Sequence, residues 1–163
     1  MRNDLRESSC CFTGHRPEKL SMPIEILRLR IERAIDTAIA EGYTTFITGM
    51  ARGTDIWAAE IVLEKKRNNK AVCLVCAVPH PGFEKRWKMY ERYRYHNILR
   101  NADEVVTVND RYFAGCYQVR NKYMVDRSSL VIAVFGGRPS GTKNTVDYAK
   151  HTGVRVVNVL KDV

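Results

Sequence analysis

The sequence of 163 residues contains no apolar stretch approaching the roughly 20 residues that a membrane-spanning helix needs, so no membrane partner is expected. Its opening residues, MRNDLRESSCCF, lack the apolar core of an export signal, which predicts a cytoplasmic protein. Internal repeats, low-complexity tracts and linker-like segments are also absent. We therefore expect residues 1–163 to fold as one globular domain.

Residues suited to metal binding or disulfide formation are few and poorly placed for it. The four histidines are not clustered with carboxylates or cysteines, so the sequence predicts no metal site; it requires no cofactor and identifies none. Cys73 and Cys76 form a C-x-x-C pattern, but they lie in an apolar run of strand length, where residues three apart point to opposite faces. Cys10 and Cys11 are adjacent in a predicted strand and diverge for the same reason. We interpret these cysteines as buried structural thiols.

The formal net charge is +9, which favours an anionic partner such as a phosphate, a nucleotide or a nucleic acid. A merely solvated basic surface explains the charge equally well. The sequence contains neither G-x-G-x-x-G nor the Walker A pattern, which disfavours an ordinary NAD-dependent dehydrogenase and a P-loop NTPase. It also lacks a nucleophile elbow.

Short apolar runs, most of them rich in valine and isoleucine, predict strands at residues 9–13, 44–48, 71–78, 104–108, 130–135 and 155–159. Helical spacing between them predicts helices over residues 24–42, 54–66, 83–100, 115–127 and 142–152. In the first helix the apolar stripe consists of Ile24, Leu27, Ile31, Ile35 and Ala38. This alternation predicts a Rossmann-like three-layer α/β/α fold with a mainly parallel sheet of five or six strands.

In such sheets, ligands bind beyond the carboxyl ends of the strands, and three of the loops expected there combine glycine with arginine or lysine. Glycine lets backbone N–H groups approach a phosphate, and arginine adds a permanent charge. Alternatively, the glycines only turn the chain and the threonines only cap helices. The ligand-binding candidates are Thr13, Gly14, His15, Arg16, Gly49, Arg52, Gly53, Thr54, Asp55, His80, Gly136, Gly137, Gly141 and Thr142.

Three blocks carry a resemblance to a known family: residues 11–17 (CFTGHRP), 49–55 (GMARGTD) and 120–126 (RNKYMVD), followed by Gly141-Thr142. In this order they resemble the YpsA/YoqJ-type proteins of bacteria and phages. These belong to the SLOG superfamily, together with the DprA/Smf DNA-processing proteins and the LOG nucleotide phosphoribohydrolases. The resemblance implies a Rossmann-like fold with a pocket for a nucleotide or nucleotide derivative, and it adds Asn121 to the ligand-binding candidates.

One departure from the LOG pattern bears on catalysis. LOG enzymes carry a P-G-G-x-G-T-x-x-E block with a catalytic glutamate, and Thr145 occupies the glutamate position in the lengthened block here. A hydroxyl cannot replace that carboxylate, so LOG-type hydrolysis is disfavoured. Glu60 is the nearest substitute as a catalytic residue, with Asp55 beside it. Alternatively, Glu60 is a solvated helix charge, and Asp55 bonds a ribose hydroxyl or favours the helix N-terminus.

Residues 83–96 mix cations and aromatics, a composition suited to single-stranded nucleic acid. Packing of the aromatics on the sheet is the simpler interpretation for most of them. Trp87, which follows Pro79-His80-Pro81, is the one expected to flank a base. Tyr112, Tyr117 and Tyr123 are further candidates for the same pocket; core packing explains each of them equally well.

The leading hypothesis is a nucleotide-binding protein with a sensor or regulatory role, holding phosphate on the Gly/Arg loops. The alternatives are a nucleotide-processing hydrolase with LOG-like N-glycosidic cleavage, and a DprA-like nucleic-acid binder. Self-association is common among SLOG proteins, so the resemblance also suggests a homo-oligomer.

Overall fold

The computed structural model describes residues 2–161, in which six parallel strands form one sheet. The strands lie in the order β4-β3-β2-β1-β5-β6, so β1 pairs with β2 on one side and with β5 on the other. This confirms the predicted Rossmann-like fold, with the strand order reversing between β1 and β5. The strands are β1 Ser9–Gly14, β2 Thr45–Thr48, β3 Cys73–Val78, β4 Glu104–Thr107, β5 Leu130–Val134 and β6 Arg155–Asn158.

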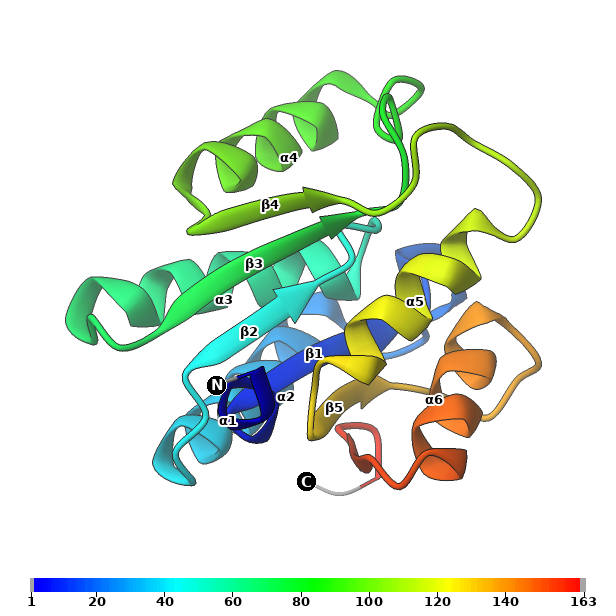
Figure 1. Ribbon diagram of the computed structural model, residues 1–163. Coiled ribbons are helices and arrows are strands. Elements are labelled where there is room, and N and C mark those ends of the chain that lie inside the picture. The colour runs from blue at the N-terminus through cyan, green and yellow to red at the C-terminus, as the bar shows by residue number, and fades with distance from the viewer. Residues whose placement is uncertain (1, 162–163) are drawn as a thin grey trace.

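Helices cover both faces of the sheet (Figure 1). One layer contains α2 Ile24–Ala40, α3 Thr54–Asn68 and α4 Met89–Asn101, and the other contains α5 Cys116–Asp126 and α6 Gly141–His151. A short helix, α1 Arg2–Glu7, precedes β1, and a 3-10 turn, η1 Pro17–Lys19, follows it; neither was predicted. None of the helices within residues 2–161 combines the length and apolar character that crossing a bilayer requires.

Two apolar clusters, one on each face of the sheet, form the core because neighbouring residues of each strand point to opposite faces. Cys10 and Phe12 pack with α2 and α3, whereas Cys11 packs with α5 and α6. The adjacent cysteines therefore diverge as predicted. All five cysteines are free, and burial raises the pKa of Cys76 to about 12, as expected for an inert structural thiol.

Helix α2 buries four of the five residues of its predicted stripe, namely Leu27, Ile31, Ile35 and Ala38. The prediction is wrong for Ile24, which is 45% exposed. Ile24 is the first residue of the helix, directly after Pro23, and it lines a surface cavity next to Arg52 and Trp87.

The predicted helix over residues 83–100 begins late, because α4 starts only at Met89. Gly82 has a φ of 75°, and two four-residue turns follow, closed by hydrogen bonds from Lys85 N–H to Gly82 O (3.1 Å) and from Trp87 N–H to Glu84 O (3.0 Å). Lys88 is extended, with ψ at 152°, which separates these turns from the helix. Consequently, Trp87 lies in a loop rather than on a helix face.

Candidate functional site

A cavity of about 570 Å³ lies at the carboxyl edge of the sheet, where the strand order reverses. Its volume is in the usual range for small-molecule sites, roughly 300–1,000 Å³. We call it the edge cavity. Its lining residues come from the end of β1 and the segment after it, from the starts of α3 and α6 with the loops before them, from the loop before α4 and from α5: Phe12, Thr13, Gly14, His15, Arg16, Lys19, Ala51, Arg52, Asp55, Phe83, Trp87, Tyr117, Gln118, Arg120, Asn121, Ser140, Gly141 and Thr142.

Many of the residues singled out in the sequence lie together in this lining, although they are far apart along the chain. These are Thr13, Gly14, His15, Arg16, Arg52, Asp55, Trp87, Asn121, Gly141 and Thr142. Tyr117 also lies there, as the sequence suggested. The lining does not include Gly49, Gly53, Thr54, Glu60, His80, Gly136 or Gly137.

The lining is strongly basic, because it contains four cations, Arg16, Lys19, Arg52 and Arg120, and a single carboxylate, Asp55. The side chains of Arg16 and Lys19 are exposed and form no ion pair among the described residues. Arg52, in contrast, bonds to Glu18 and donates to Glu91 Oε2 over 3.0 Å. The cavity therefore contains both free and partly neutralised cations.

Arg120 is the main functional candidate that the sequence did not indicate. It is only 5% exposed, and its guanidinium bonds to Gly49 O and donates to Asn121 Oδ1 over 2.8 Å. It also lies 5.8 Å from the Phe83 ring centroid. Burial lowers its pKa from the ordinary value, and the neighbouring Asp55 carboxylate opposes that shift. Its only sequence signal was its position in the RNKYMVD block.

Asp55 is buried at the start of α3, where its Oδ2 accepts the Ala51 N–H over 3.2 Å. Burial raises the pKa of its carboxyl to about 6, against the opposing effects of Arg120 and of the Ala51 hydrogen bond. Gly49 permits this arrangement: a Cβ at that position would lie 2.9 Å from Asp55 Oδ2 and 3.0 Å from the Arg120 guanidinium.

Two helices begin at the edge cavity. Helix α3 starts at Thr54 after Gly53, and Asp55 in its first turn lines the cavity. Helix α6 starts at Gly141, with Ser140 as its N-cap: Ser140 Oγ accepts the Lys143 N–H over 3.1 Å. Helix N-termini carry positive partial charge and free backbone N–H groups, so both favour an anion here.

The loop from β2 to α3 is held in an uncommon conformation. Met50 has a φ of 63°, in the left-handed region that residues other than glycine rarely adopt, and its side chain is fully buried. Its N–H donates to Thr48 Oγ1 over 3.3 Å. Strain of this kind costs roughly 1–3 kcal/mol and is frequent at functional sites.

His15 and Gly14 shape the cavity from β1. Gly136 N–H donates to His15 Nε2 over 3.0 Å, which ties the loop after β1 to the loop after β5. Burial, assisted by Lys19 and Arg138, lowers the pKa of His15. A Cβ on Gly14 would overlap Thr54, whose buried hydroxyl has no hydrogen-bond partner among the described residues.

Two further candidates lie elsewhere. His80 packs among the rings of Phe83, Tyr112 and Tyr117, behind the lining, and its Nδ1 lies 2.8 Å from Pro81 O. Tyr123 lies with the α5–α6 core cluster and does not line the edge cavity.

Glu60 is held away from the edge cavity by two arginines. Arg28 and Arg94 donate to its carboxylate over 3.1 and 2.5 Å. Burial alone would raise the pKa of Glu60, but the two arginines outweigh it and the pKa is lowered. A carboxyl group with a lowered pKa is less suited to act as a general acid.

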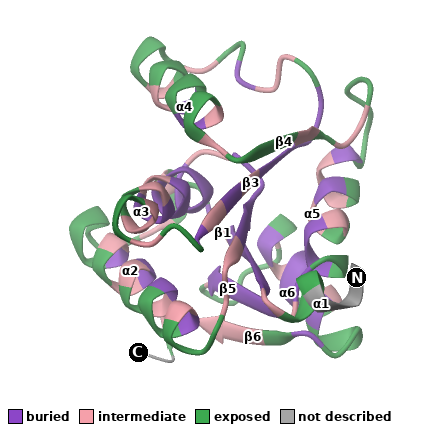
Figure 2. Ribbon diagram, turned by 60° about the vertical axis from the view of Figure 1, so that its left-hand side comes forward, coloured by how far each residue is buried: buried purple, intermediate pink, exposed green. Residues whose placement is uncertain are grey.

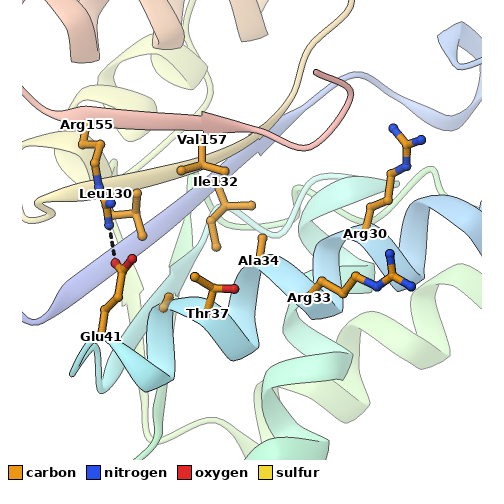
Figure 3. A pocket seen from close by; sticks show the side chains of 10 residues that line it. Arg30, Arg33, Ala34, Thr37, Glu41, Leu130, Ile132, Arg155 and Val157 are labelled. Atoms are coloured by element: carbon orange, nitrogen blue, oxygen red, sulfur yellow. Dashed lines mark hydrogen bonds and ion pairs between the residues drawn. The ribbon is translucent and has the colours of Figure 1, made fainter. Parts of the chain in front are cut away.

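A different cavity, of about 290 Å³, opens between α2 and the strands β5 and β6 (Figure 3). Leu130 and Arg155, the first residues of these two strands, both line it, so it lies toward the amino edge of the sheet. None of the predicted ligand-binding residues lines this cavity.

A parallel sheet whose strand order reverses at a basic cavity defines a Rossmann-like α/β protein. The model of the YspA SLOG family (YpsA) matches residues 10–155, and the chain therefore belongs to this family. The uncharacterized SPbeta prophage-derived protein YoqJ of Bacillus subtilis is 33% identical over 119 residues, covering 66% of this chain and 70% of YoqJ.

Solved structures of DNA processing protein A (DprA) share the fold at low sequence identity. The protein from Streptococcus pneumoniae aligns with a TM-score of 0.67 and 17% identity over 93% of this chain. The protein from Helicobacter pylori, described for its single-stranded DNA binding mode, aligns with a TM-score of 0.64 and 17% identity over 95% of this chain. This chain spans 50% of the first and 66% of the second.

Proposed function

We propose that this protein binds a nucleotide or nucleotide derivative in the edge cavity, with the phosphate held by the loops at the carboxyl edge, and that it acts as a sensor or regulator. The observation that carries the proposal is that Arg16, Lys19, Arg52 and Arg120 line one cavity with a single carboxylate, beside the N-termini of two helices. Such a site stabilises a phosphate through charge and backbone N–H groups together.

The aromatic part of the lining supports a nucleotide over inorganic phosphate. Phe83, Trp87 and Tyr117 line the same cavity as the arginines, and Phe83 packs against both other rings at centroid distances of 5.3 and 5.5 Å. Base–aromatic stacking contributes roughly 1–3 kcal/mol per base. In this proposal residues 1–163 work as one SLOG domain in the cytoplasm, and self-association remains a prediction.

Binding without turnover is the expected outcome. The Thr145 hydroxyl, at the position of the LOG glutamate, donates to Gly141 O over 2.9 Å and is engaged in α6. Asp55 is the one carboxylate in the lining of the edge cavity, and Ala51 and Arg120 already surround it. We therefore expect a bound nucleotide to be recovered intact.

A thermal-shift series tests the proposal: adenosine, AMP, ADP, NAD and ADP-ribose are added to the protein, and each is recovered for mass spectrometry. We expect the phosphate-bearing compounds to raise the melting temperature, adenosine to have little effect, and all masses to be unchanged. A series in which adenosine stabilises as strongly as AMP would contradict the phosphate site. Release of free base would indicate the hydrolase alternative.

A DprA-like interaction with nucleic acid is the second candidate, favoured by the net charge of +9 and by the shared fold. It predicts that the protein slows the migration of an oligonucleotide in a gel at physiological salt. The affinity should fall steeply as the salt concentration rises.

A further inference from the structure

A further cavity, of about 260 Å³, adjoins the edge cavity at Arg52 and Trp87, the two residues that line both. We call it the tryptophan cavity, because both tryptophans of the chain line it. It is lined by Pro17, Glu18, Ile24, Arg52, Gly53, Ile56, Trp57, Trp87, Lys88, Tyr90, Glu91 and Arg94.

Aromatic and apolar side chains dominate one part of this lining. Trp57 is only 4% exposed and forms the floor of this part, whereas Trp87 is half-buried. Tyr90 and Ile24 are 61% and 45% exposed, so a ligand in this cavity can contact both side chains. Rings placed in this way can stack on a flat heteroaromatic group.

Most charges of the tryptophan cavity are already paired: of its three cations only Lys88 forms no ion pair among the described residues, whereas both Arg16 and Lys19 are unpaired in the edge cavity. Arg52 bonds to Glu18 and Glu91, which line the same cavity, and Arg94 is bound to Glu60. A second phosphate would have to displace these carboxylates, whereas an uncharged ring would not. The volume suffices for one ring, since a cavity of about 150 Å³ accommodates benzene.

We propose that the tryptophan cavity is a subsite for a second nucleobase, so that the ligand contains two bases joined through phosphate. The phosphate lies in the edge cavity, one base lies against Phe83 and Tyr117, and the other lies against Trp87 and Tyr90, next to the buried Trp57. This inference rests on the proposed nucleotide function. A free dinucleotide and a segment of single-stranded nucleic acid both have this chemistry.

The test compares AMP with a 5′-phosphorylated adenylyl-adenosine dinucleotide on the full-length protein and two matched variants. Tyr90→Ala removes a ring from the tryptophan cavity. Tyr93→Ala removes a ring that is 68% exposed on the same helix and lines neither cavity. We expect the dinucleotide to bind at least about 10-fold more tightly than AMP, and Tyr90→Ala to lose most of that advantage. Tyr93→Ala should bind both compounds as the parent protein does.

Tryptophan fluorescence gives a second readout that does not depend on affinity. In Trp87→Phe, Trp57 is the single remaining tryptophan, so its emission reports on the tryptophan cavity alone. The dinucleotide should change that emission, and AMP should leave it unchanged.

The outcomes separate this inference from the proposed function. Failure of both compounds to bind the parent protein would contradict the proposed function itself. Equal affinities for AMP and the dinucleotide, together with unchanged Trp57 emission, would overturn the second subsite but not the nucleotide site. Loss of AMP binding in Tyr90→Ala would also overturn it. If these results support the subsite, a 12-nucleotide oligoadenylate distinguishes the two sources of the ligand. An affinity higher than that of the dinucleotide and sensitive to salt indicates a single strand. An affinity equal to that of the dinucleotide indicates a free dinucleotide.

Discussion

Two cavities of this protein contain three arginines each, yet only one has the properties of an anion site. The edge cavity contains Arg16, Arg52 and Arg120, and the cavity between α2 and β6 contains Arg30, Arg33 and Arg155. In the cavity between α2 and β6 the carboxyl end of α2 contributes negative partial charge, and Arg155 is neutralised by Glu41 over 2.5 Å. Figure 3 shows Arg155 directed at Glu41 and Arg30 and Arg33 extended beyond the apolar side chains.

The difference is in the backbone and in burial rather than in the number of arginines. Two helices begin at the edge cavity, and Arg120 is fixed there among buried groups. At the other cavity a helix ends, and Arg33 is exposed. An anion site in a parallel sheet thus depends on which ends of strands and helices surround it.

Removal of Arg120, which is buried, should have the largest effect. The cavity between α2 and β6 contains no arginine that is buried to the same degree. In Arg120→Met, Asp55 and the Gly49 carbonyl lose their partner, so we expect a loss of about 3–5 kcal/mol in the free energy of unfolding. Urea unfolding measures it. Asp55→Asn in the Arg120→Met background should recover part of the loss. If the stability changes of the two single variants simply add up in the double variant, Arg120 and Asp55 do not interact.

The buried carboxyl of Asp55 makes the free energy of unfolding depend on pH. Its folded-state pKa of about 6 exceeds the ordinary 3.8, so the folded state binds its proton more tightly than the unfolded state does. The carboxyl therefore costs stability as pH rises from about 4 through 6, by about 2–3 kcal/mol in full. Asp55→Asn should be more stable than the parent protein at pH 8 and similar near pH 4, by urea unfolding at each pH. A difference independent of pH would contradict the assignment.

The N-cap of α6 should have a smaller effect. Ser140→Ala removes the acceptor of the Lys143 N–H, for which we expect a loss of about 1 kcal/mol in stability. Ser140→Asp restores a cap but adds a negative charge to the edge cavity. It should regain the stability and still bind AMP less tightly than the parent protein. Full AMP affinity in Ser140→Asp would show that no phosphate lies near this helix end.

The sequence was sufficient for the sheet because its strands are short apolar runs that alternate with helical segments, most clearly Leu130–Val134, which is buried on both faces. It was insufficient at α4, where turns around Gly82 interrupt a pattern with helical spacing. Figure 2 shows the further difficulty that much of α4 is exposed, so its spacing did not report a buried face.

For the site, the rule that ligands lie after strands located Arg16, Arg52 and Gly141, which share the edge cavity. The same rule could not find Arg120, because it lies in the middle of α5 and reaches the cavity only through the packing of that helix. It also selected His80, which follows β3 but packs among aromatic rings. Distances between loops depend on tertiary packing, which a single sequence does not reveal.

The central claim is that phosphate binds at the carboxyl edge and not wherever arginines gather. Calorimetric titration with AMP of the parent protein, Arg16→Ala and Arg33→Ala tests it directly, since each variant loses one exposed arginine from one of the two compared cavities. We expect Arg16→Ala to bind about 10- to 100-fold more weakly and Arg33→Ala to match the parent protein. Equal losses in both variants, or a larger loss in Arg33→Ala, would contradict the claim.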